Sequence, residues 1–142
     1  EYAEKWANDA FENDHYRLAF DAENSWSIKY NLVWDKLLGL NVFDKKVFKT
    51  EIEYYKTKIN KYGLPLDCRS TYTKSDWQLW STEFCDDKEY SDRIISAMVR
   101  MLSDAPIRAP FTDWYHTDNA IQLMFQNRSV QGALFIKMLK FS

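Results

Sequence analysis

The sequence predicts an all-α fold made of consecutive antiparallel helical hairpins. Apolar residues recur at the spacing i, i+3, i+4, i+7 in several separate stretches, which places them on one side of a helix. Only three Gly and three Pro occur in 142 residues, and most lie between these stretches, where helices end. The connections are short, and short connections join antiparallel neighbours.

Composition and charge exclude several classes of protein. A hydrophobic fraction of 46% and an aromatic fraction of 17% are far above those of disordered chains. With 19 Lys and Arg against 21 Asp and Glu, the net charge of −2 offers no basic face for nucleic acid. The longest apolar runs, such as residues 133–136, are too short to span a bilayer. We therefore expect one folded unit over residues 1–142, without a nucleic-acid partner or a membrane span.

The first helix is expected to begin at Tyr2 and to end near Asn13 and Asp14. No capping residue precedes it, so we expect the chain to be part of something longer, with any signal peptide upstream. An extended stretch, residues 16–20, and a turn, residues 23–25, follow.

The second helix is predicted by an apolar stripe that ends near Gly39, comprising Tyr30, Val33, Trp34 and Leu37. Lys29 and Asp35 lie off this stripe, so they are expected on a solvated face.

The third helix has the strongest local signals. Asp44 is a good N-cap residue, and Phe43 and Phe48 occupy the two positions of a hydrophobic staple. Gly63 and Pro65 mark where the helical pattern has stopped.

Three further helices complete the prediction. Residues 73–76 read as a capping box before a helix that ends near Asp86. The next helix ends at Ala105 and Pro106, and a loop over residues 109–118 leads to the last one. Their apolar stripes are Trp77, Trp80 and Phe84; Ile94, Ile95, Met98 and Leu102; and Val130, Leu134 and Met138.

Carboxylates, cationic side chains and aromatic rings cluster in three segments at helix ends. Loops held by a rigid scaffold are where binding sites are usually built. A pair of carboxylates can supply an acid and a base, Arg can clamp a ligand carboxylate, and Trp can form a flat wall. The segments offer Trp26, Lys29, Tyr30, Asn31 and Asp35; Asp67, Arg69, Lys74 and Asp76; and Asp113, Trp114 and Tyr115.

Each of these residues also has a purely structural interpretation. Asp76 would serve as a capping residue, and Trp77 as a core aromatic. Asp67 would be explained by an Asx-turn or a salt bridge with Arg69, and Asp113 by a packed loop. Both interpretations stay open at this stage.

Neither metal nor cofactor chemistry is indicated. His15 and His116 have no partner at a metal-ligand spacing, and phosphate-loop and dinucleotide fingerprints are absent from the sequence. The spacing of Cys68 and Cys85 selects neither a disulfide nor a zinc site, and we expect two free, buried thiols.

Four motifs together resemble the glutaminase A family: WSIKYNLVWDKLLGL at 26–40, YGLPLD at 62–67, YTKSDW at 72–77 and TDWY at 112–115. The similarity continues through Phe125 and Arg128 to the last helix, so it covers nearly the whole chain. Cys68, where relatives tend to have Ser or Thr, and His116, where an acid is usual, depart from the pattern.

The resemblance implies a secreted or periplasmic hydrolase that converts the side-chain amide of L-glutamine to glutamate and ammonia. It also implies that the chain forms about half of an (α/α)6 toroid, the C-terminal portion of a six-hairpin domain completed by the rest of the parent chain. Arg69 would then bind the α-carboxylate of the substrate, and one of Asp67, Asp76 and Asp113 would be the base. Lys74, Trp77, Trp114 and Tyr115 complete the expected substrate-binding set.

Two other functions remain open. Paired carboxylates and Trp platforms suit a glycoside hydrolase with a sugar substrate equally well. Alternatively, the segment is a non-catalytic helical module that completes the toroid. In either case we expect the isolated chain to be inactive, and its uncovered apolar flank predicts self-association.

Overall fold

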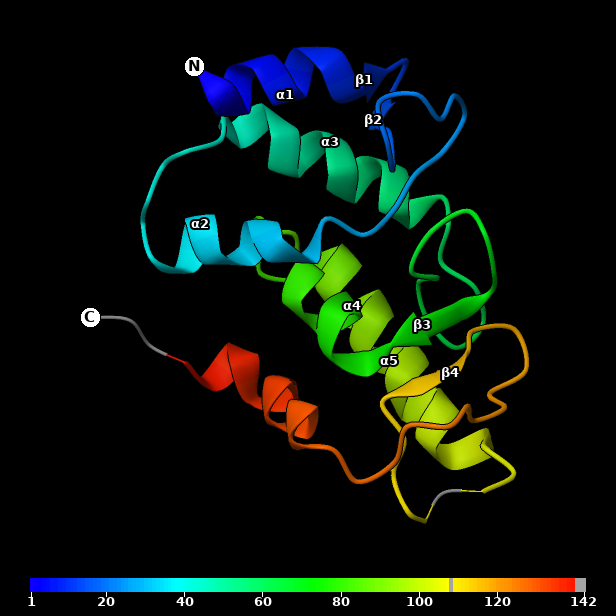
Figure 1. Cartoon of the computed structure of the whole chain (residues 1–142). Coiled ribbons are helices and arrows are strands. Elements are labelled where there is room, and N and C mark those ends of the chain that lie inside the picture. Colours follow the sequence, from blue (N-terminus) through cyan, green and yellow to red (C-terminus); the bar gives the residue numbers. More distant parts are fainter. Residues whose placement is uncertain (108, 140–142) are drawn as a thin grey trace.

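The computed structural model describes residues 1–107 and 109–139 (Figure 1). Its helices are α1 (Tyr2–Ala10), α2 (Val33–Leu37), α3 (Lys45–Lys56), α4 (Ser75–Ser81) and α5 (Lys88–Asp104), with 3₁₀ helices η1 (Tyr30–Leu32) and η2 (Ser129–Met138). Four short strands accompany them: β1 (Phe11–Glu12), β2 (His15–Tyr16), β3 (Tyr72–Lys74) and β4 (Trp114–His116).

Helix α4 lies at the centre of the arrangement (Figure 1). It packs against η1 and α5 and, most extensively, against η2. Helices α4 and α5 are consecutive in the chain, whereas α4 and η2 are separated by the whole of α5 and β4. The fold is thus mainly helical, as predicted, but its most extensive contact joins elements that are distant in sequence.

The two longest helices are those with clear local signals. The side chain of Asp44 accepts a hydrogen bond of 2.7 Å from the Lys46 amide and caps α3. Asp87 does the same for α5 through the Tyr90 amide at 2.8 Å, and α5 ends before Pro106. The predicted third and fifth helices are therefore confirmed.

The first helix ends earlier than predicted, at Ala10. Phe11 and Glu12 instead pair antiparallel with His15 and Tyr16, and Asn13 turns the chain with φ of +55°. Asn tolerates this left-handed conformation better than most residues, so a tight hairpin forms where helical periodicity alone suggested another turn. Of the predicted extended stretch, only Tyr16 belongs to a strand.

The predicted capping box at residues 73–76 is wrong. Thr73 lies in β3, and the N-cap of α4 is Lys74, whose side chain makes no capping hydrogen bond. Strand β3 pairs antiparallel with β4, with Thr73 opposite Tyr115 and Lys74 opposite Trp114. The Ser75 amide donates to the Asp113 carbonyl at 2.9 Å, so contacts with the β4 segment take the place of a side-chain cap.

Lys29 and Asp35 are not on a solvated face. The carboxylate of Asp35, 7% exposed, accepts hydrogen bonds from the Val42 and Phe43 amides at 2.8 and 2.9 Å. The Lys29 ammonium lies 3.5 Å from the Glu51 carboxylate in the core. Both side chains satisfy groups that the folded chain buries, which a helical-face pattern cannot reveal.

Most buried apolar residues form one core between α3, α4, α5 and η1, and a smaller cluster around Tyr62, Met101 and Tyr115 lies under β4. The last predicted helix is present as the 3₁₀ helix η2, with Ile136 buried. Both thiols are free, as predicted, but Cys68 is exposed and Cys85 half-buried. None of the helices over residues 1–107 and 109–139 has the length and apolar character needed to cross a membrane.

Candidate functional site

The antiparallel pair β3–β4 brings Lys74, Asp113 and Arg128 together. The Lys74 ammonium lies 3.1 Å from Oδ2 of Asp113. Arg128, the residue before η2, donates through Nε to Oδ1 at 3.0 Å and through Nη2 to Oδ2 at 2.5 Å. Asp113 is 1% exposed, so a buried carboxylate is clamped between two cations.

These cations fix the charge of Asp113. Burial works to raise the pKa of this carboxyl group, but the hydrogen bonds from Arg128 and Lys74 outweigh it and hold the pKa below its ordinary range. The pKa of Lys74 is lowered, chiefly by burial and further by the charge of Arg128. Asp113 is therefore a weaker base than an ordinary aspartate, and its carboxylate positions two cations.

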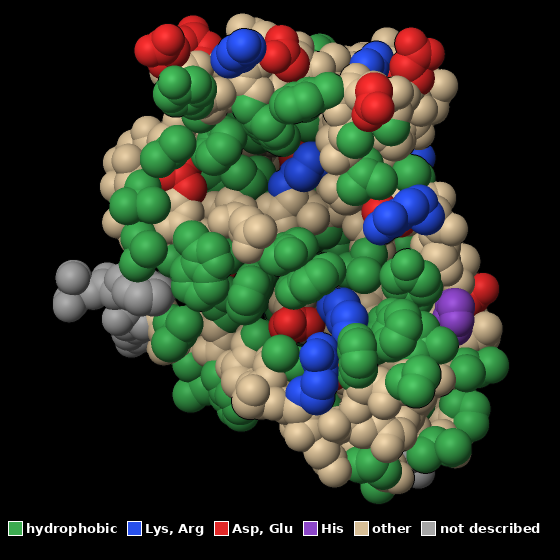
Figure 2. Space-filling view, viewed as in Figure 1, with side chains coloured by type: hydrophobic (Ala, Val, Ile, Leu, Met, Phe, Trp, Pro, Cys, Tyr) green, Lys and Arg blue, Asp and Glu red, His purple; other side chains and the backbone are tan. Residues whose placement is uncertain are grey.

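Aromatic rings enclose the same cations. The Lys74 ammonium lies 3.9 Å from the centroid of Phe125 and 4.9 Å from that of Trp114. The guanidinium carbon of Arg128 lies 4.1 Å from the Phe125 centroid. Cation–π contacts of this kind hold charged groups in place and exclude water. Figure 2 shows acidic and basic side chains meeting within a largely hydrophobic face of the molecule.

Asp76 is the second buried carboxylate, and its surroundings are the opposite of those of Asp113. It is 4% exposed, and its Oδ1 has no hydrogen-bond partner among the described residues. Burial raises its pKa, the negative charge of Asp113 raises it further, and nearby backbone amides and Lys74 oppose the change. Asp76 also lines a cavity of about 310 Å³ with Trp34, Trp80 and residues of η2. It is the group best suited to accept a proton.

Asp67 and Arg69 form a pair of their own. The guanidinium donates to both carboxylate oxygens of Asp67, at 3.0 and 2.7 Å, and the Arg69 amide donates to Oδ1 at 2.8 Å. Burial works to raise the pKa of Asp67, but Arg69 lowers it overall. The hydrogen-bonding capacity of Asp67 is largely used within this loop, in line with the salt-bridge interpretation.

Two other predicted site residues, Trp77 and Tyr115, pack against neighbouring side chains. Trp77 stacks on Tyr30 with 3.9 Å between centroids and 9° between planes. Tyr115 is fully buried, and its hydroxyl donates to the Tyr62 carbonyl at 3.1 Å and accepts from Gln78. The Tyr115 side chain therefore points from β4 into the core, where it cannot contact a ligand.

Sequence reasoning did not select Arg128, Phe125, Trp34 or Trp80 as site residues. Trp34 and Trp80 lie in helical stripes and looked like core residues. The continuation of the family resemblance through Phe125 and Arg128 was the available signal for the other two.

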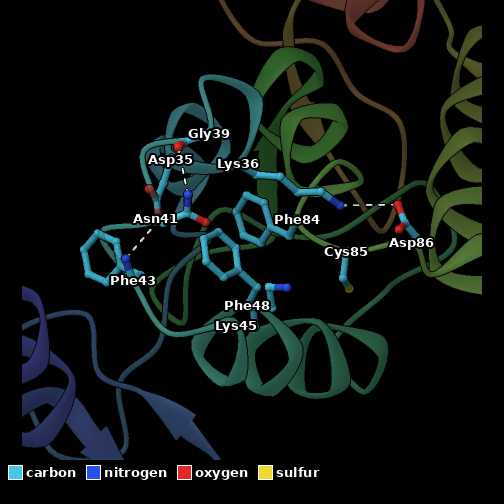
Figure 3. A pocket seen from close by; sticks show the side chains of 10 residues that line it. All are labelled: Asp35, Lys36, Gly39, Asn41, Phe43, Lys45, Phe48, Phe84, Cys85 and Asp86. Atoms are coloured by element: carbon cyan, nitrogen blue, oxygen red, sulfur yellow. Dashed lines mark hydrogen bonds and ion pairs between the residues drawn. The ribbon is translucent and has the colours of Figure 1, made fainter. Parts of the chain in front are cut away.

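A separate pocket of about 300 Å³ lies between α2, α3 and the end of α4 (Figure 3). Phe48 and Phe84 form its floor, and Lys36 and Asp86 pair at 3.3 Å on its rim. Of the candidate residues that the sequence offered, Asp35 lines this pocket, where it binds the Val42 and Phe43 amides. Over the part of the chain that is described, groups of three or more His, Cys, Asp or Glu suited to a metal ion are absent.

The fold and the site define a class: a helical domain with a cluster of carboxylates, cations and aromatic rings, and with a ligand-sized cavity lined by Asp76 and two Trp side chains. Residues 1–138 match the Glutaminase A six helical-hairpin domain, and the chain belongs to this family.

Two curated relatives agree with that assignment. Glutaminase A of Aspergillus oryzae is 30% identical over an alignment covering 98% of this chain and 21% of the relative. A probable glutaminase of Arthroderma benhamiae is 27% identical, covering 82% of this chain and 17% of the relative. The chain therefore spans about a fifth of the length of these relatives. No solved structure matches it.

Proposed function

We propose that these residues form a substrate site of an amidohydrolase that converts a glutamine side-chain amide to the acid and ammonia. One observation carries the proposal. Asp76, a buried carboxylate with an unpartnered oxygen and a raised pKa, lies near two cations whose positions are fixed by Asp113.

In the proposed reaction Asp76 acts as a general base. Its carboxylate takes a proton from water, and the water oxygen attacks the amide carbon to give a tetrahedral intermediate. Asp76 then returns the proton to nitrogen, the carbon–nitrogen bond breaks, and ammonia leaves. A raised pKa makes the carboxylate a stronger base than an ordinary aspartate.

The cations serve binding and charge stabilisation. Arg128 is the more accessible, with 39% of its side chain exposed, and it would bind the α-carboxylate of the substrate. Lys74 would stabilise the negative charge that develops on the amide oxygen. The resemblance had given the carboxylate-binding role to Arg69, whose guanidinium is bound to Asp67 just as that of Arg128 is bound to Asp113. We assign the role to Arg128 because its charge interacts with Asp76.

The test is ammonia release from L-glutamine by the whole protein that carries these residues. We expect Asp76→Asn to lower kcat by about a hundredfold or more, the usual contribution of a general base. Asp35→Asn is the matched control, because Asp35 is also a buried aspartate but only holds the backbone of residues 42 and 43. It should keep kcat within a few-fold.

Full activity of a folded Asp76→Asn variant would contradict the proposed mechanism. Release of a sugar without ammonia would favour the glycoside hydrolase alternative, for which Trp34 and Trp80 beside Asp76 provide the specific support. Secretion or export to a periplasm stays a prediction of the family resemblance.

A further inference from the structure

We propose that the cavity beside Asp76 binds an ammonium ion, the second product of the proposed reaction, and that such cations inhibit the site. Organic ammonium ions share this chemistry and bind in the same place. The inference rests on the proposed function, because Asp76 is the base of that reaction.

The cavity combines one acidic side chain with apolar walls. Its volume of about 310 Å³ is at the lower end of the range for small-molecule sites. Trp34 and Trp80 both line it and meet edge to face, with 5.2 Å between their centroids. Of the described residues in its lining, Asp76 alone carries a charge. Apart from the hydroxyl group of Ser129, the rest of the lining is apolar and comes from η2 and Leu139.

Asp76 lacks a counter-charge of its own. The cations whose charges act on it, Lys74 and Arg128, are both bound to Asp113. The Asp76 side chain is buried, and its Oδ1 has no hydrogen-bond partner among the described residues. Burial and the charge of Asp113 both disfavour the ionised form and raise the pKa of Asp76. A cation in the cavity would supply the missing partner, because a buried charge is stable only when it is paired.

The lining suits an ammonium ion better than a metal ion. Calcium and magnesium ions are surrounded by about six to eight oxygen ligands. This lining offers one carboxylate and one hydroxyl group, and residues 1–107 and 109–139 hold no group of three or more His, Cys, Asp or Glu suited to a metal. Indole rings attract ammonium ions, including those whose nitrogen carries methyl groups. Asp76, Trp34 and Trp80 therefore point to an ammonium ligand.

The proposed reaction produces such an ion beside Asp76. Hydrolysis of the amide gives a carboxylic acid and ammonia, and the acid then transfers its proton to ammonia, which yields a carboxylate and an ammonium ion. Asp76 ends the cycle ionised, since it has returned the proton that it took from water. An ammonium ion paired with Asp76 lowers its pKa and occupies its carboxylate, so that Asp76 cannot accept a proton from the next water molecule.

Trp34 offers a variant that changes the cavity and leaves Asp76 in place. Its side chain is 38% exposed, so replacing it perturbs the core less than replacing a buried residue would. Trp34→Leu removes one aromatic wall and keeps an apolar side chain there. Phe135→Leu is the matched control, because Phe135 is also an exposed aromatic residue, at 62%, but does not line the cavity.

The experiment measures glutamate formation from L-glutamine by the whole protein in ammonium chloride, tetramethylammonium chloride or sodium chloride at equal ionic strength. We expect both ammonium ions to inhibit at concentrations about tenfold or more below that of sodium. Trp34→Leu should weaken inhibition by tetramethylammonium about fivefold or more, the size of one cation–π contact, and Phe135→Leu should leave it unchanged. Inhibition by tetramethylammonium alone would overturn the role of the product and leave organic ammonium ions as the ligand.

Binding without turnover separates this inference from the proposed function. Titration with tetramethylammonium chloride should change the Trp fluorescence of the wild type, and Asp76→Asn should abolish the change. An equal response of Asp76→Asn would contradict the pairing with Asp76, and this titration decides should Trp34→Leu fail to fold.

Two further outcomes distinguish the proposals. Glutamate formation that responds to all three salts alike, with unchanged fluorescence, would overturn the inference and leave the amidohydrolase proposal intact. A fluorescence response without any glutamate formation would overturn the proposed function, while the ammonium site in the cavity would stand.

Discussion

At the scale of single residues, Asp76 and Asp113 show how environment separates two buried aspartates. The folded-state pKa of Asp76 is raised, so its contribution to stability is present below its unfolded pKa and is lost as pH rises through the folded value. At neutral pH the ionised form is therefore a cost to folding. Groups selected for activity often carry such a cost.

We accordingly expect Asp76→Asn to increase the free energy of unfolding by about 1 kcal/mol at neutral pH. The gain should shrink as pH falls from neutral through the raised folded-state pKa, and it should be gone below about 4, the ordinary pKa of an unfolded aspartate. Urea unfolding of wild type and variant at both pH values measures the difference. A variant less stable than wild type at neutral pH would show that Asp76 has a stabilising partner.

Asp113 should behave in the opposite way. Its pKa is lowered, so its contribution to stability is present above the unfolded pKa and is lost as pH falls through the folded value. Asp113→Asn leaves Lys74 buried without its counter-charge, and we expect a loss of about 3 kcal/mol at neutral pH. The loss should diminish towards pH 3 in the same unfolding measurement, whereas a constant loss would exclude an electrostatic origin.

The residues of the site were only partly predictable from the sequence. Asp76, Lys74, Asp113 and Trp114 were selected by motif, and the structure places them together. Arg128 was not selected, because its contact with Asp113 depends on the path of the chain between β4 and η2. A sequence likewise cannot show that Oδ1 of Asp76 lacks a hydrogen-bond partner. The sequence pattern suggested a capping role for Asp76 instead.

At the scale of elements, what could be predicted depended on whether the signal was local. Helices α3 and α5 have N-cap residues and apolar stripes within a few turns, and both were predicted correctly. Strands β3 and β4 are three residues each and lie on either side of α4 and α5 in the chain. Their pairing is a tertiary contact, and such short strands have no periodicity long enough to detect.

Gly63 shows how one residue fixes the position of α4. Its φ is +139°, and a Cβ atom there would lie 2.3 Å from Oε1 of Gln78. That oxygen accepts from the Leu64 amide at 3.2 Å, while the amide nitrogen of Gln78 donates to Tyr115. The Tyr62–Leu64 turn, α4 and β4 are therefore joined at Gln78.

We expect Gly63→Ala to destabilise the protein by about 2 kcal/mol or more, because it adds backbone strain and displaces Gln78. Gly132→Ala is the control, since its Cβ would meet nothing within 4 Å. Thermal unfolding of the two variants measures the contrast. Equal melting temperatures would mean that Gln78 moves aside without loss of its hydrogen bonds.

At the scale of the whole molecule, the packing is uneven. The side that carries α3 and α5 encloses a continuous core. The segment after α2 instead exposes Leu38, Leu40 and Val42, each by at least 55%, and η2 exposes Phe135 and Met138 by 62% and 73%. Apolar clusters of this kind mark surfaces that contact another part of a protein or another molecule.

The chain belongs to a six-hairpin family and spans about a fifth of the length of its relatives. These two facts offer an explanation for the exposed apolar surfaces. In a closed ring of hairpins, the exposed residues beside α2 and on η2 would face neighbouring hairpins supplied by the rest of the protein. Burial of a Leu or Val side chain contributes about 1.5–3 kcal/mol, so a chain that lacks these neighbours can lower its free energy by associating with copies of itself.

We therefore expect the isolated 142-residue chain to self-associate at micromolar concentrations, as measured by multi-angle light scattering. Leu40→Glu combined with Val42→Lys should shift it towards a monomer, because both positions are exposed and a charge there opposes burial. The same pair placed in the whole protein should lower its melting temperature, since there the positions would be covered. A stable monomer from the unmodified chain, with a single cooperative melt, would show that these exposed residues do not need a partner surface.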